Sequence, residues 1–170
     1  KNNNLRRMVM IGRVGKALKY GDNINTDIIS PPAYMELPIE EAAKYAMYPI
    51  DPDFAKRCNP GDIFVTENNC GSGSSRETAP LALRQLGIRT ILAKSYARIF
   101  YRNCINLGIL AIECKDTHEI SADDKLQVDY EKGIIQNLTT GKSYVCDKIP
   151  PHIIELVSSG GLISYLKKKL

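Results

Sequence analysis

The sequence predicts a three-layer α/β domain with a parallel βαβαβ core and added short antiparallel strands. In residues 62–113, short apolar runs rich in β-branched residues alternate with helical segments that end at glycine. Short connections of this kind favour parallel strands with helices on the faces of the sheet. After residue 124, strand-like runs separated by turn residues predict antiparallel pairing. A length of 170 residues supports one core, so we expect residues 1–170 to form a single domain.

The N-terminal zone predicts a strand, a loop and a helix. Residues 9–20 are strand-like and end at a Gly-Asp-Asn turn signal. Residues 25–32 are expected to form an irregular loop, because the Pro-Pro pair that ends the segment disfavours helix before it. Pro38 suits a first helical turn, and the apolar spacing after it predicts a helix that extends to about residue 48.

Residues 62–113 predict the parallel βαβαβ core. Strands are expected at residues 62–67, 90–94 and 109–113, and helices at residues 74–86 and 97–107. Each predicted helix stops at a glycine, which is the usual residue just after a helix end.

The last zone predicts three short strands and two helices. The strands fall at residues 125–130, 133–138 and 142–146, and the helices at residues 150–157 and 162–168. The three lysines near the C-terminus are interpreted as a solvated helix end that complements the helix dipole.

Composition excludes several classes of protein. The 23 basic and 19 acidic residues leave a charge of +4, which is weak evidence for nucleic acid, and we expect no such partner. No apolar run approaches the roughly 20 residues that span a bilayer, so we expect no membrane segment. The N-terminus lacks a secretory h-region, which favours the cytoplasm, and residues 1–8 are expected to be disordered or vector-derived.

The cysteines are widely spaced and form no CxxC pair, at Cys58, Cys70, Cys104, Cys114 and Cys146. Zinc and iron–sulfur sites usually need closely spaced thiolates, so we predict no metal site in this chain. A reducing compartment with buried thiols is the simplest interpretation. Cys70 adjoins a glycine-rich segment, and a functional role for it stays open.

Residues 68–80 (NNCGSGSSRETAP) carry the clearest chemical signal. The segment follows a predicted strand and opens a predicted helix, and Ser74 and Glu77 have capping-box spacing. Backbone N–H groups at a helix start favour an anion, and Arg76 adds a planar cation suited to carboxylate or phosphate. The segment lacks a Walker ending and an evident Ser-His triad. A loop that only caps the helix is the open alternative.

Residues 25–31 (NTDIISP) form a second candidate segment. A polar group before an apolar pair and a proline fits a simple turn with local hydrogen bonds. Both segments nevertheless follow predicted strands, where binding residues collect in α/β folds.

Three stretches resemble the swivelling β/β/α domain of the aconitase superfamily. They are GSGSSRE at 71–77, TDIISP at 26–31 and AKSYARIFYRNCINLG at 93–108, and their order and spacing also fit. A free-standing chain of this length resembles the small subunits of the isopropylmalate isomerase and homoaconitase type.

The resemblance implies a hydro-lyase that isomerises a small hydroxy di-acid by dehydration and rehydration. It also implies a partner, a large aconitase-type subunit that carries a [4Fe–4S] cluster with one open iron site. No cofactor is then expected on this chain.

The resemblance assigns roles to four residues. Ser74 matches the family's catalytic serine, an alkoxide-like base, and Arg76 matches the arginine that binds a substrate carboxylate. Ser75 matches a neighbouring substrate contact. Asp27 matches an active-site aspartate, to which we assign the orientation of Ser74 or its surroundings rather than metal binding.

Thr26 and Ser30 are expected to support the same site. The chain departs from the family at Thr78, where His or Gln is frequent. We expect this difference to alter loop packing rather than the chemistry.

The family uses the loop at residues 32–37 to recognise the variable group of the substrate. Homoaconitase-type members carry an Arg there, whereas this chain has Met35 and Glu36. A carboxylate arm would meet an apolar surface and a like charge, which lowers its affinity. We therefore expect an apolar group, as in 3-isopropylmalate or 2,3-dimethylmalate, over a homoaconitase substrate.

Two other functions compete with a catalytic subunit. A stand-alone module would use the loop at residues 71–76 to bind carboxylate or phosphate without catalysis. A structural subunit would keep the fold with a dead site. The joint presence of Ser74, Ser75 and Arg76 favours the catalytic subunit.

Overall fold

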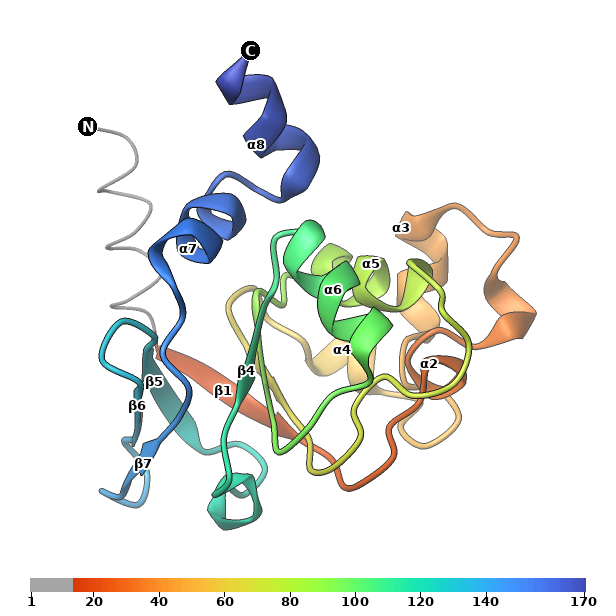
Figure 1. Ribbon diagram of the computed structural model, residues 1–170. Coiled ribbons are helices and arrows are strands. Elements are labelled where there is room, and N and C mark those ends of the chain that lie inside the picture. The colour runs from red at the N-terminus through yellow and green to blue at the C-terminus, as the bar shows by residue number, and fades with distance from the viewer. Residues whose placement is uncertain (1–13) are drawn as a thin grey trace.

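The computed structural model describes residues 14–170 and is shown in Figure 1. The expectations for residues 1–8, and for the part of the first strand before Val14, lie outside the described residues. Across residues 14–170, the helices are all too short or too polar to cross a membrane.

Seven strands form one curled sheet, in the order β4-β3-β2-β1-β5-β6-β7. Strands β1 to β4 are parallel, whereas β5 to β7 are antiparallel to their neighbours. The predicted βαβαβ core and the added antiparallel strands are therefore confirmed. The strands are β1 (Val14–Lys19), β2 (Ile63–Val65), β3 (Thr90–Ala93), β4 (Leu110–Glu113), β5 (Lys125–Asp129), β6 (Ile134–Asn137) and β7 (Ser143–Val145).

Helices α2 to α6 gather on one side of the parallel strands, while β5 to β7 lie away from them (Figure 1). The longer helices are α5 (Thr78–Gln85), α6 (Arg98–Asn106), α7 (Pro151–Ser158) and α8 (Leu162–Lys169). The others are single turns: α2 (Thr26–Ile29), η1 (Pro32–Tyr34), α3 (Ile39–Ala42), η2 (Ala43–Tyr45), α4 (Phe54–Arg57) and η3 (Thr117–Glu119).

Alternating side chains on the parallel strands separate two apolar cores. In β2, Phe64 packs with the helices, whereas Ile63 and Val65 join the core of the antiparallel strands. In β3, Ile91 belongs to the first core and Leu92 to the second. Since successive strand residues point to opposite faces, this pattern places the parallel strands between two layers. The predicted three-layer β/β/α fold is confirmed.

The two outermost strands of the sheet meet at one point. Cys114 follows β4, Cys146 follows β7, and the two residues form an isolated antiparallel bridge. The curl of the sheet thus brings its first and last strands together, and this junction is called the seam below.

The loop predicted at residues 25–32 contains a helical turn, α2. Asn25 caps it, because its side-chain oxygen accepts a hydrogen bond from the Ile28 amide at 2.9 Å. The restriction that Pro31 imposes falls on Ser30, which has left the helix with φ −132° and ψ 87°. The prediction was wrong because the proline lies two residues beyond the end of the turn.

Two predicted helices are shorter than expected. The helix expected at residues 38–48 gives way to a 3₁₀ turn after Ala42, and Met47 has a positive φ of 62°, which no helix accommodates. The helix expected to start at Ser74 starts at Thr78, and its N-cap is Glu77 without a side-chain hydrogen bond. The predicted Ser74–Glu77 capping box is therefore wrong.

Candidate active site

The loop between β2 and α5 is shaped by glycine. Gly71 has a φ of +81°, and a Cβ atom there would lie 2.0 Å from Cγ of Phe100 in α6. Gly73 also has a positive φ, at +97°. Only glycine permits this backbone turn and this close approach to the Phe100 ring. Gly71 therefore allows the loop to lie directly against the start of α6, while Gly73 lies beside Thr26.

Backbone hydrogen bonds tie this loop to the segment after β3. The Cys70 amide donates to the Ser95 carbonyl at 3.0 Å, and the Ala97 amide donates to the Cys70 carbonyl at 2.9 Å. The Asn69 amide donates to the Ser95 hydroxyl oxygen at 2.8 Å. Because the ends of β2 and β3 are neighbours in the sheet, these bonds extend their pairing into the loops.

Thr26 links the second predicted segment to the first. Its amide donates to the Ser72 carbonyl at 2.8 Å, and its hydroxyl donates to the Ser74 carbonyl at 2.9 Å. Thr26 is only 1% exposed, so both bonds are shielded from water. The two sequence motifs, about fifty residues apart, thus form one structural unit.

An ion pair joins the same two motifs. Arg76 Nη1 lies 3.0 Å from Asp27 Oδ1, in an orientation that makes it an ion pair rather than a hydrogen bond. The Arg76 side chain is 23% exposed and that of Asp27 is 55% exposed. Asp27 is therefore placed to orient the guanidinium while the remaining nitrogens stay available to a ligand.

Ser74 is exposed and lies before the helix rather than capping it. In the described chain, the Ser74 hydroxyl and the amides of residues 73–75 form no hydrogen bond. A run of free amides in a glycine-rich turn makes a concave anion site without a helix terminus. The expected anion binding stays a prediction, and its donors would be the loop amides and Arg76 rather than a helix start.

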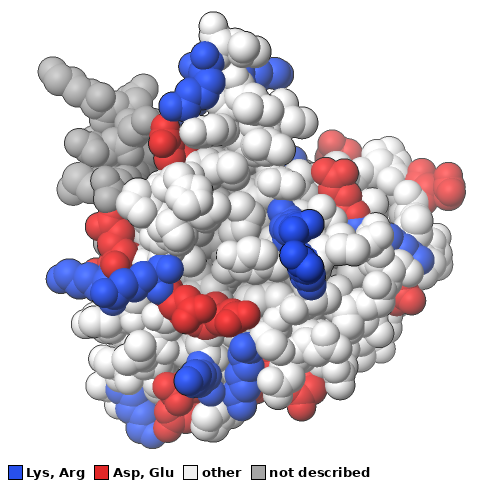
Figure 2. Space-filling view, in the orientation of Figure 1, with Lys and Arg blue, Asp and Glu red and all other residues white. Residues whose placement is uncertain are grey.

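A pocket of about 180 Å³ opens at this loop. Thr26, Ser74, Ser75 and Arg76 line one wall. The other lining residues include five from α6 and its start: Ala97, Arg98, Ile99, Phe100 and Asn103. Basic side chains lie over α6, in the middle of the face shown in Figure 2. The pocket therefore combines an exposed serine hydroxyl with positive charge.

Not every predicted site residue lines this pocket. Ser30 is 7% exposed and contributes to the α2 turn through its amide, which donates to the Thr26 carbonyl at 2.8 Å. Met35 is 40% exposed at the end of η1 and lies outside the pocket lining. The sequence reasoning assigned no role to Arg98 or Asn103, although both fall within the stretch 93–108 that carries the resemblance.

The thiols of this chain are suited to packing rather than to metal binding. Burial raises the pKa of the Cys70 thiol beside the loop to about 12, so it stays protonated at neutral pH. A functional role for Cys70 gains no support. No three cysteines converge among residues 14–170.

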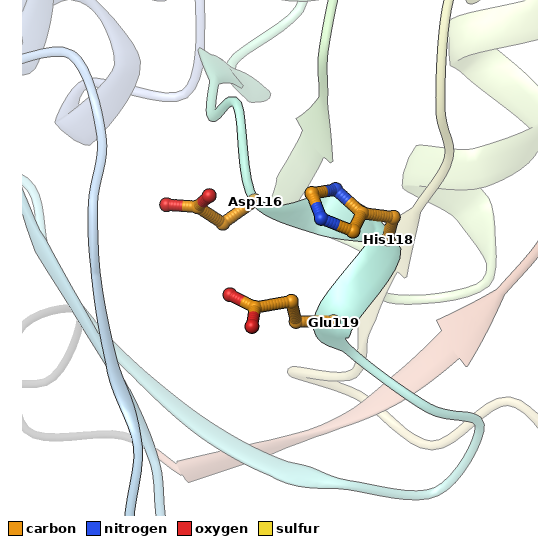
Figure 3. Close-up of side chains that lie close together, drawn as sticks. All are labelled: Asp116, His118 and Glu119. Carbon is orange, nitrogen blue, oxygen red and sulfur yellow. The ribbon is translucent and has the colours of Figure 1, made fainter.

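One group in the described chain has metal-type donors: Asp116, His118 and Glu119, whose side chains converge from the η3 turn (Figure 3). Hard oxygen and imidazole donors do not match the thiolates that hold iron–sulfur clusters. Glu119 also pairs with Lys142 at 3.7 Å. The residues of this part of the chain therefore do not fit a [4Fe–4S] cluster.

Comparisons with known proteins show the family of this chain. A family model, the aconitase C-terminal domain, matches residues 22–117. The chain is 46% identical to the 3-isopropylmalate dehydratase small subunit 1 of Archaeoglobus fulgidus, covering 91% of this chain and 96% of the relative. It is 48% identical to the isopropylmalate/citramalate isomerase small subunit of Methanocaldococcus jannaschii, covering 92% and 94%.

A solved structure of a similar protein has the same fold as this chain. The crystal structure of 3-isopropylmalate dehydratase from Methanocaldococcus jannaschii superimposes with a TM-score of 0.87 at 39% identity, covering 92% of this chain and 93% of that chain. The chain therefore belongs to the aconitase family, through its C-terminal domain. Its similarity extends over nearly the full length of the 3-isopropylmalate dehydratase small subunits. The expected family membership is confirmed.

Proposed function

We propose that this chain is the small subunit of a cytoplasmic 3-isopropylmalate dehydratase, forming one swivelling domain over residues 1–170. The enzyme is a hydro-lyase that interconverts 2-isopropylmalate and 3-isopropylmalate. One observation supports this most: the exposed Ser74 hydroxyl, three free amides and the Arg76 guanidinium share one pocket. Relatives that cover nearly the whole chain carry this enzyme's name.

Ser74 acts as the base that removes a proton from carbon. A serine hydroxyl is a poor base near neutral pH, so its oxygen needs a surrounding that stabilises negative charge. The free amides of residues 73–75 and the Arg76 guanidinium provide such a surrounding. The same groups stabilise the charge that develops on the adjacent substrate carboxylate.

Arg76 binds a substrate carboxylate through its planar fork, and Ser75 supplies a neighbouring contact. Asp27 orients Arg76 through the 3.0 Å ion pair. Thr26 holds the Ser74 carbonyl and so fixes the loop. Ser30 helps to fix Thr26, because the Ser30 amide donates a hydrogen bond to the Thr26 carbonyl.

The partner is a large aconitase-type subunit that brings the [4Fe–4S] cluster. The names of the relatives, as small subunits, support a heteromeric assembly. When present, that cluster would supply Lewis-acid chemistry for the loss of the substrate hydroxyl. Because Ser74 and Ser75 are exposed here, a second surface is needed to exclude water from the pocket.

The substrate's variable group is apolar. Met35 and Leu37 are 40% and 42% exposed at the end of η1, beside the exposed Glu36. This surface lies outside the pocket lining, and a variable group that extends to it would find apolar contact, whereas an extra carboxylate would be repelled. The Methanocaldococcus jannaschii relative is named for isopropylmalate and citramalate, whose variable groups are both apolar. Turnover of homocitrate above isopropylmalate would overturn this choice.

The test is the activity of the chain combined with its large subunit. Ser74→Ala should lower kcat by about 10²- to 10⁴-fold, the usual contribution of a general base, while binding to the large subunit is retained. Ser72→Ala, in the same loop but outside the pocket lining, is the matched control and should leave kcat unchanged. Full activity of Ser74→Ala would refute the proposal and favour a structural subunit.

A further inference from the structure

At the seam between β4 and β7, two cysteines lie opposite each other on neighbouring strands. Cys114 and Cys146 form its bridge and belong to the second apolar core, at 2% and 7% exposure. Opposite residues of an antiparallel pair point to the same side of the sheet. Both sulfurs therefore face that core, at the one bridge that joins the outer strands.

The hydrogen bonding defines the type of pair. The Asp147 amide donates to the Glu113 carbonyl at 3.0 Å, so the bond lies one residue beyond the cysteines and not between them. Such non-hydrogen-bonded pairs have Cα atoms about 4.5 Å apart, which lies within the range of disulfides. The Cys114 thiol donates to the Val145 carbonyl at 3.6 Å, which places its sulfur beside the partner residue.

We propose that Cys114 and Cys146 are a redox site of this chain, which forms a cross-strand disulfide by exchange with a low-molecular-weight disulfide. One cysteine loses its proton and attacks the small disulfide, forming a mixed disulfide and releasing one small thiol. The second cysteine attacks that mixed disulfide and releases another small thiol. The protein loses two protons and two electrons, and the oxidant is reduced to two thiols.

The seam also explains how the oxidant reaches two buried thiols. Strand β7 has three residues and lies at the edge of the sheet, with Val145 77% exposed. Short edge strands open locally more easily than central ones. Burial raises the pKa of both thiols, that of Cys146 to about 12, so exchange at neutral pH is slow and follows opening.

The other thiols lack this arrangement. Cys58 is partly exposed, whereas the other four cysteines are buried, and it forms no isolated β-bridge in the described chain. Cys70 and Cys104 are both 0% exposed in the helix-side core. The selectivity for the seam therefore comes from its cross-strand pairing at an edge.

The experiment treats the full chain with oxidised glutathione under native conditions and maps its peptides without reduction. Trypsin with cleavage after Glu113 separates Cys104 from Cys114 and leaves Cys146 in the peptide of residues 143–148. We expect the Cys114 and Cys146 peptides to be linked, with the loss of two hydrogen atoms. A disulfide elsewhere, or only glutathione adducts, would overturn the proposal.

Stability gives a second, independent measure. A bond that closes residues 115–145 should raise the thermal unfolding midpoint by about 10 °C, and reductant should reverse the change. Cys146→Ser should abolish both the cross-link and the shift, whereas Cys58→Ser should keep both. An oxidised protein with an unchanged or lower midpoint would contradict the fit of the disulfide to the seam.

Discussion

Gly71 is the position where the loop of the candidate active site tolerates a side chain least. In Gly71→Ala, the new Cβ would lie 2.0 Å from Cγ of Phe100, at a φ of +81°. A left-handed conformation costs a non-glycine residue about 1–2 kcal/mol, and overpacking adds about 1–3 kcal/mol. The expected loss in the free energy of unfolding is therefore about 2–5 kcal/mol, measured by urea denaturation. A loop displaced by about 1 Å should also lower kcat by roughly 10²-fold in the assembled enzyme.

Substitutions at two other glycines separate the cost of the left-handed backbone from the cost of overpacking. Gly141 has a φ of +78° and open space around it, so Gly141→Ala measures the backbone cost alone, about 1–2 kcal/mol. Gly21 has neither a positive φ nor a neighbour within 4 Å, so Gly21→Ala should change the free energy by less than about 0.5 kcal/mol. A Gly71→Ala variant that loses no more than Gly141→Ala would refute the role assigned to the Phe100 contact.

Three further predictions concern charge. Arg76→Lys keeps the positive charge but loses the planar fork of the guanidinium, so KM should rise by about 10- to 100-fold while the free energy of unfolding stays unchanged. An unchanged KM would contradict carboxylate binding by Arg76. Asp27→Asn breaks a half-exposed ion pair, so stability should change by less than about 0.5 kcal/mol, while KM rises because Arg76 loses its orientation; kinetics identical to wild type would exclude that role. The hydrogen bond from Arg57 lowers the pKa of Asp51 below 3.8. Because the unfolded chain takes up that proton first, the urea midpoint should fall as the pH drops through and below about 4, and less steeply in Asp51→Asn.

The strands of the core could be predicted because their sequence signals are local. Residues 62–67, 90–94 and 109–113 are apolar runs with helical segments between them, and all three contain strands. The antiparallel strands could be predicted because turn residues separate the three strand-like runs. The closure of the sheet at the seam could not be predicted, because Cys114 and Cys146 are far apart in sequence and carry no pairing signal of their own.

The start of α5 shows how a tertiary contact overrides a local signal. Ser74 and Glu77 have the spacing of a capping box, and in isolation this favours a helix from Ser74. In the folded chain, the Ser74 carbonyl accepts a hydrogen bond from the Thr26 hydroxyl, and the backbone of Gly73 has a left-handed conformation. These contacts hold the segment as a turn, and the helix begins at Thr78. The later start leaves the serine hydroxyl free.

The pocket residues on α6 show which part of the candidate site could not be predicted from local sequence motifs. The motifs at residues 26–31 and 71–77 contained the predicted residues, and Thr26 and Asp27 do contact the Ser74 loop. Arg98 and Asn103 line the same pocket, where Gly71 packs closely on Phe100 of α6. The resemblance of residues 93–108 was the one sequence signal that could have marked them, since their place in the pocket depends on how α6 lies against the loop.

The same geometry explains why a serine base would need a second chain. Backbone bonds and glycine packing fix the Ser74 loop without covering it, so its hydroxyl and free amides face the surrounding water. In water, charge stabilisation by amides and a guanidinium is weak, and it strengthens as the local dielectric constant falls. A large subunit that closes over the pocket would strengthen every one of these interactions at once. The isolated chain should therefore bind carboxylates weakly and remain inactive, whereas tight binding by the chain alone would favour a stand-alone anion-binding module.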